Sequence, residues 1–503
     1  MNIVIATSEA VPFAKTGGLA DVCGSLSLQL RKLGHNVTVI MPAFRQVFKC
    51  GLPIEPTEIS FPVAIAGKSV SARILRSHLP DSDCEVLLVD QPVYFDREGL
   101  YGDAQGDYWD NCERFAFFCR AALSAIDQLD SPPDIVHCND WQTGLIPAYI
   151  ANRFDSHPWM MHATSVMTIH NMAYQGQFWH WDMLLTGLGW DQFTPDKMEF
   201  YGHLNLLKTG IVFADAITTV SERYAQEIQQ PDHGCGLDGV LRLRRHLLTG
   251  IVNGVDDQIW NPATDPHLES NYDIDNWKAG KHANRSAIRT EFGLDDDPDL
   301  PLIGLVGRLA EQKGWDLVTD LMNNWLGEGT PAQWIVLGTG DLRYHQTLSE
   351  LAARFGKRLA VHLGFSDRLA HRIEAAADIF LMPSRYEPCG LNQLYSLRYG
   401  AIPVVNPTGG LADTVVDATE QSIHERRATG FYMHGYHTRA LGEALDRAVS
   451  LYRDHPTAWE QLVLTGMRQD WSWKRSAVRY EQLYQETIER ERSYVAPGSS
   501  HHA

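Results

Sequence analysis

Short apolar runs alternate with longer helical segments along most of the chain, and this alternation restricts the fold more than any other feature. The chain begins with an apolar run at Ile3–Thr7, a glycine loop at Lys15–Gly18, and a helical pattern at Leu19–Leu33 that stops at Gly34. Strands separated by helices pair in parallel, so the first half is expected to form a doubly wound α/β sheet. Its strands are expected at 3–7, 37–41, 85–89, 135–137 and 166–170.

A second alternation of the same kind follows a polar segment at Asn253–Asp275, whose Asn-Gly, Asn-Pro and repeated Asp are typical of a connection between domains. A chain of 503 residues also exceeds what one hydrophobic core usually supports. We therefore expect two parallel-sheet domains, 1–260 and 261–475, then a C-terminal helix at 476–490 with one apolar stripe, and a disordered tail at 495–503. The strands of the second domain are expected at 302–307, 334–337, 360–363, 379–382 and 402–405.

Net charge and composition narrow the classes of partner. The formal net charge of −19 disfavours nucleic acid and anionic membrane surfaces, and no apolar run approaches the ~18 residues needed to span a membrane. Eight scattered cysteines without a Cys-x-x-Cys pair indicate reduced thiols, and no secretion signal precedes the first strand. We therefore expect a cytoplasmic protein that holds any anionic substrate with a local basic cluster. Its oligomeric state is left open.

One glycine-containing motif occurs twice: Thr16–Asp21 is repeated word for word at Thr408–Asp413, each time where a loop enters a helix. A glycine pair at a helix N-terminus lets backbone N–H groups approach an anion, and the helix dipole favours negative charge there. The two copies, with Lys15 before the first, are expected to share local geometry and to contact phosphate. The alternative is a tight turn without a ligand. Neither copy has the Walker A or G-x-G-x-x-G spacing, which disfavours an NTPase or a dehydrogenase.

Two cations and a glutamate follow strands of the second half. Arg308 directly follows the strand at 302–307, and Lys313 comes five residues later. Ligands bind at the carboxyl ends of strands in open α/β sheets, so the two cations favour a diphosphate site over a solvated surface. Glu387, in the loop after the strand at 379–382, could accept hydrogen bonds from sugar hydroxyls. The alternative for Glu387 is a helix cap beside a proline turn.

The histidines and acidic runs do not indicate a metal site. His137 and His170 are expected at strand ends, and either could be a buried imidazole with its hydrogen bonds satisfied. No second and third ligands appear at useful spacing. Two Asp-x-Asp matches, at 81–83 and 295–297, follow no clear strand and are interpreted as solvated charge.

Six motifs follow one another in a fixed order over nearly the whole chain. They are Lys15–Asp21, His137–Trp141, Thr168–Asn171, Asn253–Asp256, Gly307–Arg308 with Lys313–Gly314, and Pro383–Leu391. In this order they resemble the motifs of the bacterial glycogen synthases and plant starch synthases, a family of glycosyltransferases. The resemblance implies the GT-B fold, two Rossmann-like domains with the active site in the cleft between them. It also implies transfer of glucose from ADP-glucose to the non-reducing end of an α-1,4-glucan such as glycogen, with retention of configuration and without a metal or other cofactor.

By motif match, the resemblance also implies roles for individual residues. Arg308 and Lys313 would hold the donor diphosphate, and Lys15 would reach it from the other domain. The glucosyl group would be surrounded by His170, Asp140, Asn253 and Glu387. Further donor-binding residues would be Gly17, Gly18, Phe365 (facing the adenine), Cys389, Gly390, Leu391, Thr408, Gly409 and Gly410.

One position departs from a common pattern, and two other functions compete with this one. Many retaining GT-B enzymes have a second glutamate eight positions after the first, whereas this chain has Tyr395, so no ribose contact is assigned there. The competing enzyme is a sucrose synthase-like or UDP-glucose-dependent transferase. The competing non-enzyme is a silent glucan-binding protein, which would be expected to lack Lys15, Arg308, Lys313 or Glu387, and all four are present.

Overall fold

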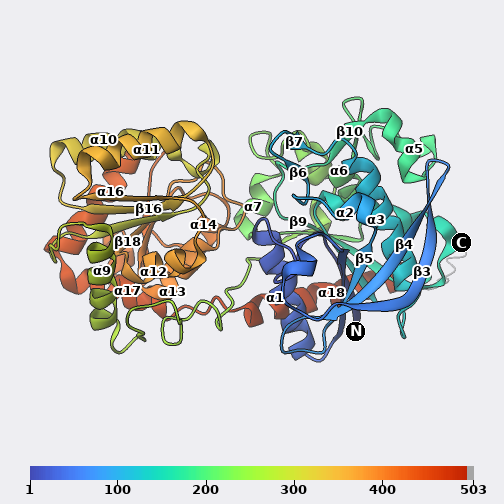
Figure 1. Ribbon diagram of the computed structural model, residues 1–503, viewed down its shortest axis with the longest axis horizontal. Helices are drawn as coiled ribbons and strands as arrows, with labels where there is room; N and C mark the ends of the chain where they lie inside the picture. The colour runs from blue at the N-terminus through green and yellow to red at the C-terminus, as the bar shows by residue number, and fades with distance from the viewer. Residues whose placement is uncertain (496–503) are drawn as a thin grey trace, which may run out of the picture. The chain divides into compact units, whose positions relative to one another are not determined.

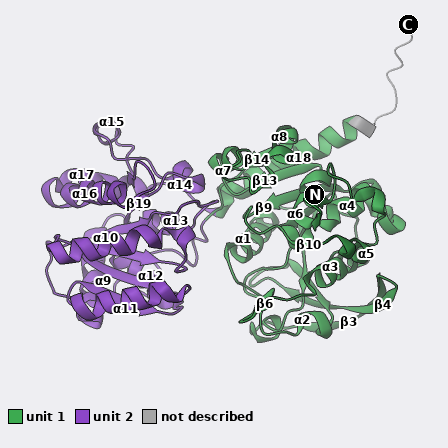
Figure 2. Ribbon diagram, turned by 90° about the horizontal axis from the view of Figure 1, so that it is seen from above, with its two compact units in different colours: residues 1–254, 473–503 green, residues 255–472 purple. Residues whose placement is uncertain are grey.

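The computed structural model describes residues 1–495 and divides into two compact units (Figure 1). Unit 1 consists of Met1–Gly254 together with the C-terminal segment from Trp473, and unit 2 of Val255–Ser472 (green and purple in Figure 2). The expected domain boundaries, after 260 and after 475, lie a few residues from these. Of the predicted tail at 495–503, only Val495 lies within the described residues, where it ends a helix. Within residues 1–495, no helix is long and apolar enough to cross a membrane.

Unit 1 is built on a sheet whose order is β14-β13-β9-β8-β1-β2-β5-β4-β3. The strands from β14 to β5 pair in parallel, whereas β4 pairs antiparallel with both β5 and β3. The predicted strands are all present, with ends that differ by a few residues. The strands are β1 (Asn2–Ala6), β2 (Asn36–Pro42), β3 (Glu55–Ile65), β4 (Lys68–His78), β5 (Glu85–Asp90), β8 (Ile135–Asn139), β9 (Thr164–Ile169), β13 (Ala216–Thr219) and β14 (Leu248–Gly250).

The helices of unit 1 bury apolar stripes against this sheet. In α1 (Gly18–Lys32), Leu19, Val22, Leu26 and Leu30 recur at helical spacing and are buried. The other helices are α2 (Pro92–Phe95), α3 (Asn111–Ile126), α4 (Leu145–Ala151), α5 (Met183–Thr186), α6 (Leu206–Phe213), α7 (Glu222–Glu227), α8 (Asp238–Leu243) and α18 (Trp473–Val495). Short strand pairings in loops are β6 (Gly102–Asp103) with β7 (Gly106–Asp107), and β10 (Gln177–Trp179), β11 (Glu199–Phe200) and β12 (His203–Asn205).

The C-terminal helix α18 is part of unit 1, although it follows all of unit 2 in the sequence. It is longer than predicted and packs on α1 and β9. Tyr480 and Tyr484, two members of the predicted apolar stripe, are fully buried, whereas Ile488 is only half-buried. The Tyr484 hydroxyl lies 2.7 Å from Nδ1 of His137. This buried polar contact, together with apolar packing, holds α18 against unit 1.

Unit 2 contains a parallel sheet with the order β17-β16-β15-β18-β19-β20. Renumbered from its first strand, the order is 3-2-1-4-5-6, the arrangement of a doubly wound nucleotide-binding fold. The predicted strands again match. The strands are β15 (Leu302–Val306), β16 (Gln333–Gly338), β17 (Leu359–Leu363), β18 (Ile379–Met382), β19 (Ile402–Val405) and β20 (Phe431–Tyr432).

Helices cover both faces of this second sheet. Alternate strand residues belong to two separate core clusters, one containing Ile303 and Leu305 and the other Leu302 and Phe380, as expected for a sheet buried on both sides. The helices are α9 (Trp277–Phe292), α10 (Trp315–Glu328), α11 (Leu342–Phe355), α12 (Asp367–Ala376), α13 (Asn392–Tyr399), α14 (Gly409–Thr414), α15 (Glu420–His424), α16 (Thr438–Asp454) and α17 (Pro456–Met467).

Candidate active site

The predicted site residues of unit 2 follow the carboxyl ends of its strands. Arg308 and Lys313 follow β15, Glu387 follows β18, and Gly409 follows β19. Strand order reverses between β15 and β18, and a reversal of this kind opens the crevice in which doubly wound sheets bind their ligands. The fold therefore brings the two cations and the glutamate to one edge of the sheet.

Lys313 and Glu387 form a partly buried ion pair. Lys313 Nζ lies 2.6 Å from Glu387 Oε2, and the Ser384 hydroxyl donates to the same oxygen at 3.0 Å. The Glu387 carboxylate is buried, whereas Lys313 keeps part of its side chain exposed. Gly314 allows this approach because its φ is +78° and a Cβ there would lie 2.2 Å from the carbonyl oxygen of Pro383. Lys313 can thus meet an anion while it stays paired with Glu387.

Arg308 is held at the same edge by its neighbours. Its guanidinium donates to Gln312 Oε1 at 3.0 Å, and Gln312 Nε2 donates to the backbone oxygen of Tyr386 at 3.3 Å. The Trp315 indole N–H donates to the Arg308 backbone oxygen at 3.1 Å. Gln312 therefore links the arginine to the loop that carries Glu387.

The second glycine pair packs directly on the Glu387 loop. Gly409 has a φ of +46°, and a Cβ there would lie 1.9 Å from the Glu387 carbonyl oxygen. The Gly410 N–H donates to the carbonyl oxygens of Glu387 and Pro388 at 3.2 and 3.1 Å. This N–H is therefore engaged within the protein, and the motif supports the backbone that carries Glu387.

The remaining predicted donor-binding residues of unit 2 lie in the loops around this edge. Gly390 has a φ of +71°, and Asn392, two residues later, donates to the carbonyl oxygen of Val306 at the end of β15. Phe365, between β17 and α12, is highly exposed. Cys389 and Thr408 are buried, and Leu391 occupies the N-cap position of α13. Their contacts with a donor stay predictions.

In unit 1, the first copy of the repeated motif is organised by Glu9, which the sequence analysis did not identify. The Glu9 carboxylate accepts from the Thr16 hydroxyl at 2.6 Å and from the Gly17 backbone N–H at 3.3 Å. The Tyr101 hydroxyl donates to it at 2.6 Å. Glu9 follows β1 as Arg308 follows β15, and this position after the first strand was the signal that could have revealed it.

The two copies of the motif differ in geometry, and the expectation of similar local geometry is wrong beyond their shared place at a helix N-terminus. Gly17 is extended, with φ −158°, and precedes the helix, whereas Gly409 is left-handed and begins it. The Gly17 N–H faces a protein carboxylate. Gly18 begins α1, and Lys15, which is 52 % exposed, forms an ion pair with Asp21 at 2.7 Å. The Lys15 ammonium is thus held beside the start of α1 by an acidic side chain of the same motif.

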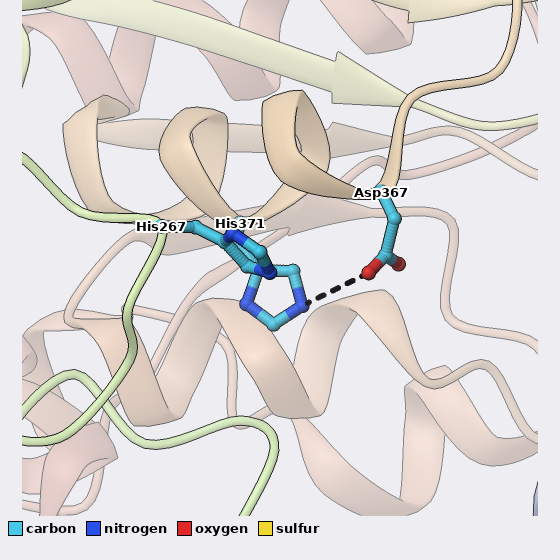
Figure 3. Close-up of side chains that lie close together, drawn as sticks. All are labelled: His267, Asp367 and His371. Carbon is cyan, nitrogen blue, oxygen red and sulfur yellow. Dashed lines mark ion pairs between the residues drawn. The ribbon is translucent and has the colours of Figure 1, made fainter.

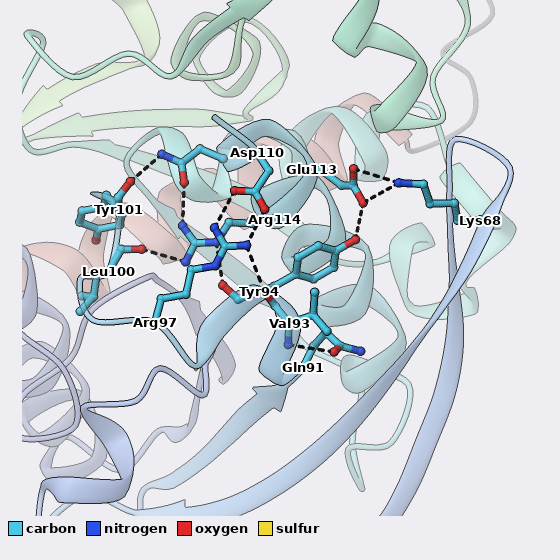
Figure 4. Close-up of polar contacts among 11 residues, drawn as sticks. Lys68, Gln91, Val93, Tyr94, Arg97, Leu100, Tyr101, Asp110, Glu113 and Arg114 are labelled. Carbon is cyan, nitrogen blue, oxygen red and sulfur yellow. Dashed lines mark hydrogen bonds and ion pairs between the residues drawn. The ribbon is translucent and has the colours of Figure 1, made fainter. Parts of the chain in front are cut away.

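A buried arginine positions the Tyr101 that holds Glu9 (Figure 4). Arg114 is fully buried and donates to the backbone oxygens of Tyr94 and Leu100 at 2.8 and 2.9 Å and to Asn111 Oδ1 at 2.6 Å. Asn111 in turn donates to the Tyr101 backbone oxygen at 2.8 Å. Burial lowers the pKa of Arg114 to about 10, so the guanidinium stays charged at neutral pH.

Asp140 and His170 meet at the carboxyl ends of the neighbouring strands β8 and β9. Asp140 has a φ of +55°, which is unusual for a residue other than glycine, and its Oδ1 accepts from the His170 backbone N–H at 2.7 Å. Burial raises the pKa of Asp140 to about 7; nearby Glu9 adds to the increase, and backbone N–H donors oppose it. The carboxyl group of Asp140 is therefore poised to change charge near neutral pH.

The imidazole of His170 is neutral with a defined tautomer. Burial lowers its pKa to about 3. Its Nε2 lies 3.0 Å from Asn139 Oδ1, while the Asn139 amide nitrogen donates to the carbonyl oxygens of Ala6 and His137. This fixes the amide oxygen as the acceptor, so Nε2 of His170 carries the proton and Nδ1 keeps its lone pair.

Two further predicted residues of unit 1 have contrasting environments. Asn253, after β14, is buried, and its Oδ1 accepts no hydrogen bond from the described residues. A buried acceptor without a donor is the kind of atom that a bound hydroxyl would satisfy.

His137 lies in the middle of β8 and not at its end, and both ring nitrogens lie within hydrogen-bond distance of core hydroxyls, those of Thr168 and Tyr484. It is a core histidine.

Two doubly wound units, each with its polar residues at the carboxyl edge of its sheet, are the architecture of GT-B glycosyltransferases, and comparison with known proteins agrees. The family model "Starch synthase catalytic domain" matches residues 2–243, and "Glycosyl transferases group 1" matches residues 286–461. The glycogen synthase of Rhodopirellula baltica is 51 % identical over 97 % of this chain and 98 % of its own length. That of Syntrophotalea carbinolica is 46 % identical over 97 % of this chain and 99 % of its own. The chain belongs to the glycogen and starch synthase family.

Solved structures confirm the GT-B fold. The catalytic domain of starch synthase IV from Arabidopsis thaliana, bound to ADP and acarbose, has a TM-score of 0.88 and 31 % identity, covering 97 % of this chain and 99 % of its own. The sucrose-phosphate synthase of Thermosynechococcus elongatus, with a TM-score of 0.58 and 17 % identity over 97 % of this chain and 99 % of its own, shares the fold alone. The chain is therefore a glycosyltransferase, as predicted.

Proposed function

We propose that this chain transfers glucose from ADP-glucose to the non-reducing end of an α-1,4-glucan, with retention of configuration and release of ADP. The observation that carries the proposal is the Lys313–Glu387 pair at the strand reversal of unit 2, beside Arg308. The related Arabidopsis structure, which holds ADP and acarbose, supports a nucleotide donor and a glucan acceptor.

The cations at this edge of the sheet would stabilise the nucleotide diphosphate as it leaves. Breaking the anomeric bond leaves negative charge on the diphosphate, and a group that binds more tightly as the charge develops lowers the barrier. One charge pair at about 4 Å and an effective dielectric constant near 20 offers roughly 4 kcal/mol before desolvation is subtracted. Arg308 and Lys313 would act from unit 2, and Lys15 from unit 1, in place of a metal ion.

The two carboxyl groups and His170 would stabilise and orient the glucosyl group. As the bond breaks, the glucosyl group gains positive character, which the buried Glu387 carboxylate and an ionised Asp140 would stabilise. The lone pair on Nδ1 of His170 and the buried Oδ1 of Asn253 would accept hydrogen bonds from sugar hydroxyls. We assign no nucleophile, because Glu387 is already paired with Lys313 and is better suited to positioning the sugar.

Unit 1 also carries exposed aromatic rings that suit a glucan. Trp179, Trp181 and Trp190 are about half-exposed although their rings, together with those of His180 and Phe193, contact one another. Clustered apolar side chains left on a surface commonly mark a binding site. Flat rings of this kind pack against the apolar faces of sugars, which favours a polymeric acceptor.

The proposal is tested by the release of ADP from ADP-glucose in the presence of glycogen, measured with and without excess EDTA. We expect ADP release that depends on glycogen and persists in EDTA, because the cations of the protein neutralise the diphosphate. Loss of activity in EDTA that Mg²⁺ or Mn²⁺ restores would overturn the metal-independent mechanism. Absence of ADP release in all conditions would overturn the proposed function.

A further inference from the structure

A cluster of metal-binding side chains lies in unit 2 (Figure 3), and none of its three members is among the residues assigned to the donor. His267 comes from the segment after β14 that precedes α9, whereas Asp367 and His371 are one helical turn apart on α12. One ligand atom from each of the three lies within 4.8 Å of the others. This cluster could not be predicted from the spacing of histidines and acidic residues, because a hundred residues separate its two parts.

His371 is buried and oriented as a metal-binding histidine would be. Its side chain is 1 % exposed, and its Nδ1 lies 2.7 Å from Asp265 Oδ2. The Tyr399 hydroxyl donates to the same Asp265 oxygen at 2.6 Å. A carboxylate behind one imidazole nitrogen fixes the proton there and leaves the other nitrogen free to bind a metal ion.

Among the described residues, the other ring nitrogen of His371 has no hydrogen-bond partner. Its Nε2 is buried and lies 3.9 Å from Asp367 Oδ2, beyond hydrogen-bond distance. The ring cannot easily turn to find a partner, because Trp260 stacks on it with 3.7 Å between ring centroids and 8° between planes. A buried polar atom without a partner is costly, so this nitrogen is suited to bind a ligand that residues 1–495 do not supply.

We propose that His267, Asp367 and His371 bind one divalent transition-metal ion of the zinc class, with water completing the coordination. Imidazole nitrogen and carboxylate oxygen suit such ions, and three protein ligands with one open position are a common zinc arrangement. Ligands about 2.0–2.2 Å from a tetrahedral ion stand about 3.4 Å apart, so the cluster must contract. Asp367, which is 66 % exposed, can move to achieve this.

The ion joins the segment that begins unit 2 to helix α12. Trp260 lies between His371 and Tyr395, stacked on Tyr395 with 3.8 Å between centroids, so fixing His371 also fixes this stack. The role is structural, and the inference does not depend on the proposed function. The competing explanation is an ordinary His–Asp ion pair that binds no metal.

Metal binding is tested on the full chain by titration with Co²⁺ after treatment with a chelator, followed by visible absorption and calorimetry. We expect one ion per chain with the spectrum of nitrogen and oxygen ligands and without thiolate absorption. Asp367→Asn and His267→Gln should each weaken binding at least tenfold. Both side chains lie at or near the surface, so these variants should fold; Asp296→Asn and His282→Gln, on other exposed sites, are the matched controls.

A second readout follows thermal unfolding with and without Zn²⁺. An ion that binds only the folded chain raises the melting temperature, so the wild type and both controls should be stabilised and the two cluster variants should not. No ion bound by the wild type, a thiolate spectrum, or binding that the cluster variants leave unchanged would each overturn the proposal. None of these results bears on glucosyl transfer, which is assayed separately.

Discussion

The Glu387 carboxylate is bound by the Lys313 ammonium and the Ser384 hydroxyl, so its orientation is set before a substrate arrives. A group fixed in this way stabilises charge in the transition state without reorganising. The alternative interpretation of Glu387 as a helix cap is wrong, because Leu391 occupies the N-cap position of α13.

Glu387→Gln should lower turnover at least ~10²-fold with only a small loss of thermal stability. The amide still accepts hydrogen bonds from both neighbours, and Lys313 is partly exposed to water. Glu350→Gln is the matched control, because Glu350 is an exposed carboxylate on α11, outside the loops that carry Arg308, Lys313 and Glu387. Turnover is measured by steady-state assays and stability by thermal unfolding, for both variants. Near wild-type turnover in a folded Glu387→Gln variant would show that Glu387 takes no part in the reaction.

Asp140 predicts a pH dependence. Because burial raises its pKa to about 7, the carboxyl group is neutral in acid and gains its charge as the pH rises through neutrality. If the ionised form stabilises the glucosyl cation, kcat/KM for ADP-glucose should rise with pH across this range. Asp140→Asn should have a low kcat/KM without that rise. An unchanged step near pH 7 in the variant would assign the titration to another group.

At the scale of elements, the central strands of both sheets and the helices α1 and α18 could be predicted, because apolar runs and helical stripes are local patterns. The strands β3, β4, β13, β14 and β20 were not predicted. Contacts made across the fold could not be predicted either. No local sequence pattern predicts that the Glu9 carboxylate accepts hydrogen bonds from Thr16 and Gly17. A third hydrogen bond to this carboxylate comes from the hydroxyl of Tyr101, which is distant in sequence. Likewise, the stripe on α18 was visible, but its partners α1 and β9 are more than 300 residues away in sequence.

The two motif copies have the same sequence but different backbone geometry, so the same Gly→Ala substitution should destabilise one copy and leave the other nearly unchanged. Gly409→Ala forces a left-handed alanine 1.9 Å from the Glu387 carbonyl oxygen, so it should cost about 1–3 kcal/mol and lower turnover by shifting the Glu387 loop. Gly17 is extended with no atom within 4 Å of the added Cβ. Gly17→Ala should therefore change the free energy of unfolding by less than about 0.5 kcal/mol. Equal stability of the two variants in denaturant titrations would contradict this difference.

At the scale of the whole molecule, the proposed roles are divided between the units. Lys313 belongs to unit 2 and faces the edge where its strand order reverses, so the donor should bind there first. Lys15 belongs to unit 1 and is already paired with Asp21, so we expect it to meet the diphosphate only in the reactive complex.

Lys313→Ala should weaken ADP binding by ~1–3 kcal/mol, the range for a hydrogen bond to a charged group. Lys15→Ala should leave ADP affinity within about threefold and lower turnover strongly, because its contact would form chiefly in the transition state. Calorimetry with ADP and steady-state kinetics separate the two effects. Equal loss of ADP affinity in both variants, with turnover of Lys15→Ala intact, would show that unit 1 is part of a preformed donor site.

The central claim is that ADP-glucose is the donor and a glucan the acceptor. The most direct measurement is incorporation of labelled glucose into glycogen from ADP-glucose and UDP-glucose, side by side at equal concentration. We predict incorporation from ADP-glucose with a kcat/KM well above that from UDP-glucose, and full release of the label by an enzyme that cleaves α-1,4 bonds. Preferential use of UDP-glucose, or incorporation from neither donor, would contradict the account.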